Sequence, residues 1–267
     1  LTWRSIVNRV WQHHLGRGLV GTPNDFGRMG ETPSHPELLD WLATWFLDTG
    51  GSLKSLHRLI VTSATYRQSS QARPDELSVD AGNRFLAHMN RRKQEAEAVR
   101  DTLLTLSGSL DPRMGGPSMK QFVMSPGIHV TPKVDYDAFP IDSPEHNRRS
   151  IYRFLFRTLP DPFMDALDCP AGDQLTPARG ESYTALQAFA MLNDVFVLRQ
   201  CERIAERLKQ ESPRASEESL VSECFRRILL REPSPAERRD CSRYAHEHGL
   251  ANVCRILLNS NEFLFVD

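Results

Sequence analysis

The chain has 267 residues, of which 40% are hydrophobic and 25% charged, and this ordinary composition indicates a folded globular protein rather than a disordered one. Its 33 basic and 34 acidic residues leave a formal net charge of -1, so no overall charge attracts nucleic acid or anionic lipid, and any anion site has to be local. No apolar run reaches the roughly 18 residues that span a bilayer. The first residues, LTWR, show neither a starting Met nor a signal-peptide pattern, and we expect a piece of a longer protein.

Apolar residues at helical spacing predict three helices in the first part of the chain. The first helix ends at Gly16, where glycine readily adopts the left-handed terminating conformation. The segment 16–33, rich in glycine and proline, predicts an irregular loop. The second helix begins near Pro36, and the third follows Ser52.

The middle of the chain mixes predicted helices with a long loop. A short helix over 83–89 leads into a longer one over 94–107, and helices return over 149–159 and around 183–210. Residues 118–147 contain several prolines and glycines, which favours a long loop with short extended pieces. This loop is also the best candidate for an internal boundary.

The C-terminal part predicts three further helices. The first carries an apolar face over 220–229, and the last covers 251–259. Between them, Ser234 and Glu237 form a capping box around Pro235 at the start of a helix. Strand-like alternation is almost absent. The sequence therefore predicts an all-α fold, an irregular multi-helix domain with long Gly/Pro-rich loops that covers residues 1–267.

A histidine-rich segment near the N-terminus suggests one candidate metal or polar site. His13 and His14 are adjacent, and Asp25, His35 and Glu37 follow in the next loop and helix. Histidine and carboxylate together can bind a metal ion, but adjacent histidines lack the i, i+4 spacing of a helical metal pair. The alternatives are a core histidine with a surface neighbour and, for His35, a local role at the helix start.

Two clusters of charge suggest further sites. Glu97, Arg100 and Asp101 share a predicted helix, where two carboxylates could act as acid and base, although a structural ion network that orients the helix is favoured. Arg149, Arg153 and Arg157 recur every fourth residue, and this spacing predicts a basic stripe for an acidic or sulfated glycan. The alternative is a solvated face paired with carboxylates.

Other signatures are missing from the sequence. It contains no GxSxG, Walker, GxGxxG or HExxH motif, although a Ser-His-Asp site on another fold would leave no local mark. Nucleic-acid binding is disfavoured, because the chain is nearly neutral and contains no recognised DNA- or RNA-binding motif. The five cysteines form no CxxC or CxxCH pattern, and we expect them to be mainly small buried residues, with disulfides as the alternative.

Several segments together resemble the planctomycete-type domain of unknown function 1553, and their order and spacing extend over nearly the whole chain. These segments are NRVWQHHLGRGLV (8–20), NDFG (24–27), SHPELLDWLA (34–43), SATYRQSS (63–70), EAEAVRD (95–101), MGGPS (114–118), RRSIY (148–152), QAFAMLN (187–193) and NSNEFLFVD (259–267).

The resemblance indicates the kind of protein in which such domains occur, but it does not indicate a reaction. Such domains lie at the C-terminal end of large exported proteins that often carry a c-type cytochrome domain upstream, so the resemblance implies export to the periplasm or cell surface. Any haem c belongs to that upstream domain, because CxxCH is absent here. No cofactor is expected within this chain, and the identity of any metal is open. No catalytic residue can be carried over.

Three functions follow as hypotheses. The first is a non-catalytic binding or scaffolding module for a partner domain of the same protein or for a glycan. The second is a metal-assisted hydrolase of polysaccharide or its substituents. The third and weakest is a docking module for the cytochrome domain, which would show salt-sensitive association.

Overall fold

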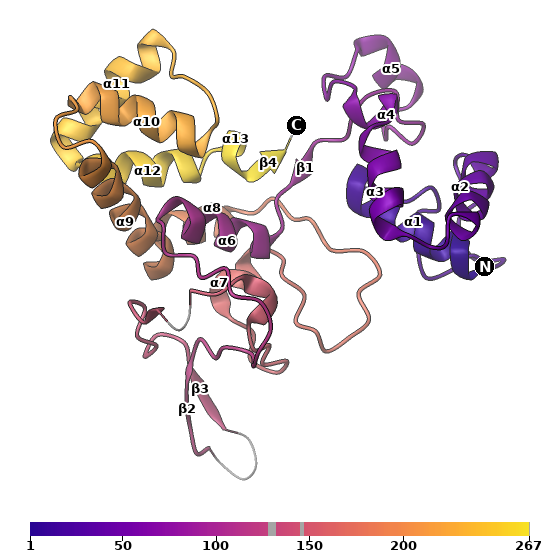
Figure 1. Cartoon of the computed structure of the whole chain (residues 1–267), viewed down its shortest axis with the longest axis horizontal. Coiled ribbons are helices and arrows are strands. Elements are labelled where there is room, and N and C mark those ends of the chain that lie inside the picture. The colour runs from indigo at the N-terminus through magenta and orange to yellow at the C-terminus, as the bar shows by residue number, and fades with distance from the viewer. Residues whose placement is uncertain (128–131, 145–146, 267) are drawn as a thin grey trace. The chain divides into compact units, whose positions relative to one another are not determined.

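The computed structural model describes residues 1–127, 132–144 and 147–266. It divides the chain into two compact units (Figure 1). The first comprises Leu1–Arg92 with the last residues from Phe265, and the second comprises Lys93–Leu264. The division therefore lies at Arg92, and residues 118–127 and 132–144 of the loop considered above as a boundary belong to the second unit. Among the described residues, no helix is long and apolar enough to cross a membrane.

The first unit is a small helical bundle. Its helices are α1 (Thr2–Leu15), α2 (Pro36–Asp48), α3 (Leu53–Val61), α4 (Ala64–Arg67) and α5 (Pro74–Val79). The core joins α1 to α2 and α3, with Val7, Phe46 and Leu56 at most 2% exposed. The fully buried Asn8 side chain donates to the Val20 carbonyl and accepts from the Val20 amide, which fixes the loop after α1 against that helix.

The second unit is mostly helical, with long irregular connections. Its helices are α6 (Ala96–Leu106), the 3-10 turn η2 (Ser150–Tyr152), α7 (Pro162–Ala166), α8 (Ala185–Asn193), α9 (Val195–Glu211), α10 (Glu217–Ile228), α11 (Pro235–His248), α12 (Leu250–Leu258) and α13 (Asn261–Leu264). Helix α12 packs against α8, α9, α10 and α11, and Figure 1 shows α9 to α12 gathered at one end of this unit.

Two small strand pairs complete the structure. Strands β1 (Arg92–Lys93) and β4 (Phe265–Val266) pair with each other. Strands β2 (Val123–Ser125) and β3 (Lys133–Asp135) form an antiparallel hairpin with Met124 opposite Val134, and these are the short extended pieces expected in the loop. The fold class is therefore mostly helical with small strand pairs.

The predicted helix over 149–159 is wrong beyond the single turn of η2. Arg149 and Arg153 have extended backbones, with ψ angles of 144° and 139°. The amide of Met119 donates to the Tyr152 carbonyl, and the amide of Phe154 donates to the Met119 carbonyl, at 2.8 Å each. Pairing with a distant segment therefore takes the hydrogen bonds that a helix would have used.

Two other predicted helices also differ. The segment 83–89 contains turns, because Asn83 and Leu86 have positive φ angles and the Asn83 amide group bonds to the His88 carbonyl. The helix predicted around 183–210 is divided into α8 and α9 at Asp194, whose backbone is extended and whose carboxylate accepts from the Phe196 amide as an N-cap. The capping box of Ser234 and Glu237 is confirmed.

Candidate functional site

The histidines of the first unit do not gather around one point. His14 Nε2 lies 2.7 Å from Nδ1 of His57, a residue of α3 that the sequence analysis did not single out. His14 also packs edge-on against Tyr66, and burial, followed by the neighbouring His57, lowers its pKa. Its neighbour His13 is exposed. This arrangement is a pair of rings joined by a hydrogen bond where α1 contacts α3.

The remaining members of that candidate site have local roles. His35 Nδ1 lies 3.0 Å from Ser34 Oγ just before α2, and Asp25 accepts from the Gly27 amide within its own loop. Glu37 is exposed on the first turn of α2. Among the described residues, no three or more His, Cys, Asp or Glu side chains form a group that could hold a metal ion. The geometry therefore gives the metal-site hypothesis no support.

The three arginines of the expected basic stripe point to different surroundings. Arg153 is buried, with its side chain 5% exposed, whereas Arg149 and Arg157 are exposed. Arg149 Nε lies 3.8 Å from an Asp101 carboxylate oxygen. Because the segment is helical only over η2 and Arg153 is buried while the other two arginines are exposed, the three side chains do not form one exposed basic face.

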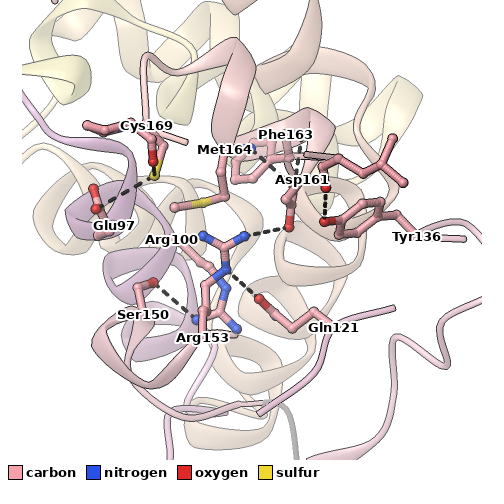
Figure 2. A network of polar contacts seen from close by, with 12 residues as sticks. Glu97, Arg100, Gln121, Tyr136, Ser150, Arg153, Asp161, Phe163, Met164 and Cys169 are labelled. Carbon is pink, nitrogen blue, oxygen red and sulfur yellow. Dashed lines mark hydrogen bonds and ion pairs between the residues drawn. The ribbon is translucent and has the colours of Figure 1, made fainter. Parts of the chain in front are cut away.

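A network of buried polar side chains lies where the stripe was expected (Figure 2). Arg153 donates from Nη2 to Asp161 Oδ2 at 2.8 Å and from Nε to Gln121 at 2.6 Å. Asp161 also accepts from the backbone amides at the start of α7. One arginine and one carboxylate thus join the segment after η2 to the start of α7 and to Gln121, which lies more than thirty residues earlier in the sequence.

Arg100 of α6 occupies the centre of this network and is 2% exposed. It donates to the Arg148 carbonyl at 2.9 Å and to Ser150 Oγ at 3.2 Å, and its guanidinium lies 5.5 Å from the centre of the Phe196 ring. Burial, followed by the charge of Arg153, lowers its pKa to about 10, so it remains charged at neutral pH. Asp101 next to it accepts from both the amide and the hydroxyl of Ser150 at 2.7 Å.

Glu97 at the start of α6 extends the network toward the loop before α8. It accepts two hydrogen bonds from Arg179, at 2.6 and 3.0 Å. Burial favours its neutral form, but the bonds from Arg179 outweigh that effect and lower the pKa of Glu97. The Cys169 thiol is 3.7 Å from the same carboxylate, and burial and this negative charge raise the pKa of Cys169 to about 11. Such a thiol is a poor nucleophile at neutral pH.

A second buried contact closes the other end of that loop. Lys93 Nζ lies 2.8 Å from Asp168, which also accepts from Ser182 and Gln187. Burial opposes ionisation, yet the bonds from Lys93 and Ser182 lower the pKa of Asp168 to about 2. Asp168 has a φ of 65°, a left-handed conformation that these contacts hold. The loop 169–184 is therefore held by an ion pair at its start, by the Arg179–Glu97 ion pair within it and by hydrogen bonds from Ser182 near its end.

Sequence reasoning missed Asp161, Asp168 and Lys93, although Asp161 before Pro162 is a recognisable helix start. It did name Glu97, Arg100 and Asp101 as a structural network, and their contacts join α6 to η2 and to the loop before α8. The cavity beside the network has a volume of about 20 Å³ and is lined by Tyr136, Asp161 and Cys169 among others. That volume holds roughly one water molecule.

Apolar side chains remain exposed on a helix of each unit. On α8 of the second unit, Leu186 is 72% and Phe189 66% exposed. On α2 of the first unit, Trp41 is 52% exposed and stacks on Trp45. Exposed aromatic and aliphatic side chains are a common feature of protein interaction surfaces.

The chain belongs to the family described as PSD1, "Protein of unknown function (DUF1553)", because the model of this family matches residues 1–245. This match confirms the resemblance found in the sequence. No curated protein and no solved structure matches the chain.

Proposed function

We propose that this DUF1553 chain is a non-catalytic binding module that holds a partner protein domain against the outer face of α8. The single observation that supports this proposal is that α8, with the sequence ALQAFAMLN, has no charged residue although most of its surface is exposed. Surface helices usually carry charged residues on the face that meets water. An exposed helix without them is suited to burial against another protein.

The outer face of α8 consists of apolar side chains apart from Asn193. Gln187 and Met191 point inward and are the buried residues of this helix. Ala185, Leu186, Ala188 and Phe189 are all exposed. Burying Leu186 and Phe189 against a partner would contribute roughly 1.5–3 kcal/mol each. Two such anchors are enough to dominate the free energy of a small interface.

The ends of α8 are fixed, so the face is presented in one orientation. Thr184 caps the N-terminus by accepting from the Gln187 amide, and Gln187 itself bonds to Asp168 at 2.9 Å. At the other end, Arg255 of α12 donates to the Leu192 carbonyl and to Asn193. A rigid binding face loses less conformational entropy when the partner docks.

The ionisable groups of the second unit support binding over catalysis. Arg153, Asp161, Glu97 and Asp168 are each engaged with other groups of the same chain. The cavity beside Asp161 and Cys169 has room for about one water molecule. These groups serve to hold irregular segments in place, and their engagement within the chain counts against the hydrolase hypothesis.

The partner that fits α8 best is another domain of the same protein, as the resemblance implies. An uncharged apolar face offers nothing to an acidic or sulfated glycan, which needs arginine or lysine. The affinity of a partner that docks on this uncharged face should change little with salt concentration. Docking of a cytochrome domain through charged groups would instead weaken as the salt concentration rises. Export of the whole protein stays a prediction.

The test compares the chain with a double variant, Leu186→Ser with Phe189→Ser, in binding to the remaining domains of its natural full-length protein. We expect the dissociation constant to rise at least about a hundredfold, since two apolar anchors are lost. The matched control is Val79→Ser, which removes a side chain that is 88% exposed on α5. Thermal unfolding checks that each variant is folded. Equal affinity of the double variant and the parent chain, or hydrolytic turnover by the chain alone, would reject the proposal.

A further inference from the structure

The outer face of α2 in the first unit presents a pair of stacked indoles. Trp41 and Trp45 are one helical turn apart, with ring centres separated by 6.4 Å and planes inclined by 27°. Trp45 is partly buried and packs against the core of this unit, while Trp41 is 52% exposed. The inner indole thus holds the outer one in place, and a broad aromatic surface faces the solvent.

Two carboxylates lie on the same face of α2 as Trp41. Glu37 precedes Trp41 by four residues and Asp48 follows it by seven, and both spacings return to the same side of a helix. Both side chains belong to exposed residues. Within the described part of the chain, neither carboxylate forms an ion pair or a side-chain hydrogen bond, whereas Asp40 on the adjacent side is paired with Arg4.

We propose that this face binds an arginine- or lysine-bearing segment of a partner protein. The negative face of an indole attracts cations, and guanidinium groups in particular stack on it. Glu37 and Asp48 would each accept charge-assisted hydrogen bonds from such groups. This proposal extends the proposed binding role to a second surface and names the chemistry of the partner.

The spacing of the two carboxylates fits an extended basic segment. Asp48 lies eleven positions after Glu37, which corresponds to about 16 Å along the helix axis. An extended peptide covers that length with about five residues. A segment with cations near both ends could therefore reach both carboxylates while a third side chain stacks on Trp41.

The charge of this face selects among ligands. An acidic or sulfated glycan would be repelled by Glu37 and Asp48. A neutral sugar could stack on Trp41, but it brings no positive charge to the two carboxylates. A basic segment can both stack on Trp41 and pair with the two carboxylates. Binding of a neutral oligosaccharide is the alternative outcome of the test.

The experiment is isothermal titration calorimetry of the chain with four probes: blocked hexa-arginine, hexa-lysine and hexa-glutamate peptides, and cellohexaose. We expect saturable binding of hexa-arginine, weaker binding of hexa-lysine, and none of hexa-glutamate. Affinity should fall as salt rises, because the contacts are charged and exposed. All four tryptophans lie within residues 1–92, so a change in tryptophan fluorescence would place binding on the first unit.

Two variants of the α2 face and two controls locate the binding. Trp41→Ala and the double variant Glu37→Gln with Asp48→Asn should each weaken hexa-arginine binding about tenfold or more. The matched control, Glu206→Gln with Glu247→Gln, removes two exposed carboxylates from the second unit and should bind like the parent chain. The Leu186→Ser, Phe189→Ser variant should also bind hexa-arginine normally, so failure of the α8 proposal can be told apart from failure of this one.

The opposite results would overturn the inference. They are no binding of hexa-arginine, equal binding by the Glu37→Gln, Asp48→Asn variant, or tighter binding of cellohexaose than of hexa-arginine. The carboxylate variant keeps the packing of both indoles. Its result therefore holds even if Trp41→Ala is poorly folded.

Discussion

Arg153 Nη2 lies 2.8 Å from Asp161 Oδ2, and these two side chains are only 5% and 17% exposed. The pair connects the segment after η2 to the first turn of α7, because Asp161 also accepts from the Phe163 and Met164 amides. Arg153 further binds Gln121, so the contact holds three irregular segments together. In a unit with long connections, such buried charged contacts replace part of the packing that regular helices would provide.

Replacing Asp161 by Asn should destabilise the chain by about 3 kcal/mol, because it leaves the buried Arg153 without its counter-charge. The free energy of unfolding from urea denaturation measures this effect. Asp165→Asn, at an exposed position of the same helix, is the control and should change stability by less than about 0.5 kcal/mol. Equal stabilities of the two variants would contradict the account.

The contact between His14 and His57 should make stability depend on pH. Because burial and His57 lower the pKa of folded His14 below its ordinary value of 6.5, the unfolded chain takes up this proton first as pH falls. The contribution of His14 to the free energy of unfolding is therefore fully present above about pH 6.5 and is lost as pH falls below that value.

His14→Gln should flatten that decline, since the amide does not titrate. Urea denaturation between pH 7.5 and 5 measures the slope for the parent chain and for the variant. His13→Gln replaces the exposed neighbour and should leave the slope unchanged. A His14→Gln slope equal to that of the parent chain would show that another group causes the pH dependence.

The five thiols should react slowly in the folded chain. Burial raises the pKa of Cys201 to about 12, and the hydrogen bond with Cys224, followed by burial, raises the pKa of Cys254. Cys241 is only partly buried, and we expect it to be alkylated first by iodoacetamide at pH 8. Mass spectrometry over time gives the order, and denaturant should make all five react. Modification of Cys254 as fast as Cys241 would contradict the structure.

The helices that could be predicted from sequence are those with a clear apolar stripe and a terminating signal. Helices α1, α10 and α11 are examples, with Gly16 after the first and the Ser234 capping box before the last. The segment 149–159 has helical spacing too, yet Met119 takes its backbone hydrogen bonds. No local pattern reveals a partner that lies more than thirty residues away.

The candidate sites, like the segment 149–159, depend on contacts with distant residues that local sequence patterns do not predict. Arg149, Arg153 and Arg157 have the spacing of a helical stripe, but the segment is helical only over η2, and Arg153 is buried against Asp161. The Glu97, Arg100 and Asp101 cluster was placed on a helix correctly, but its partners Arg179 and Ser150 come from distant loops. Helix α8 lies within the helix predicted around 183–210, but which of its side chains are exposed depends on the elements that pack against it.

The most direct test of the binding role is carbene footprinting of Leu186 and Phe189, with labelling read by mass spectrometry. The chain alone and its natural full-length protein are labelled side by side. We expect strong labelling of both residues in the chain alone, because they are 72% and 66% exposed, and at least severalfold protection in the full-length protein. Val79 on α5 should label equally in both samples. Equal labelling of Phe189 in the two samples, or protection of Phe189 already in the chain alone, would contradict the proposal that α8 binds a partner domain.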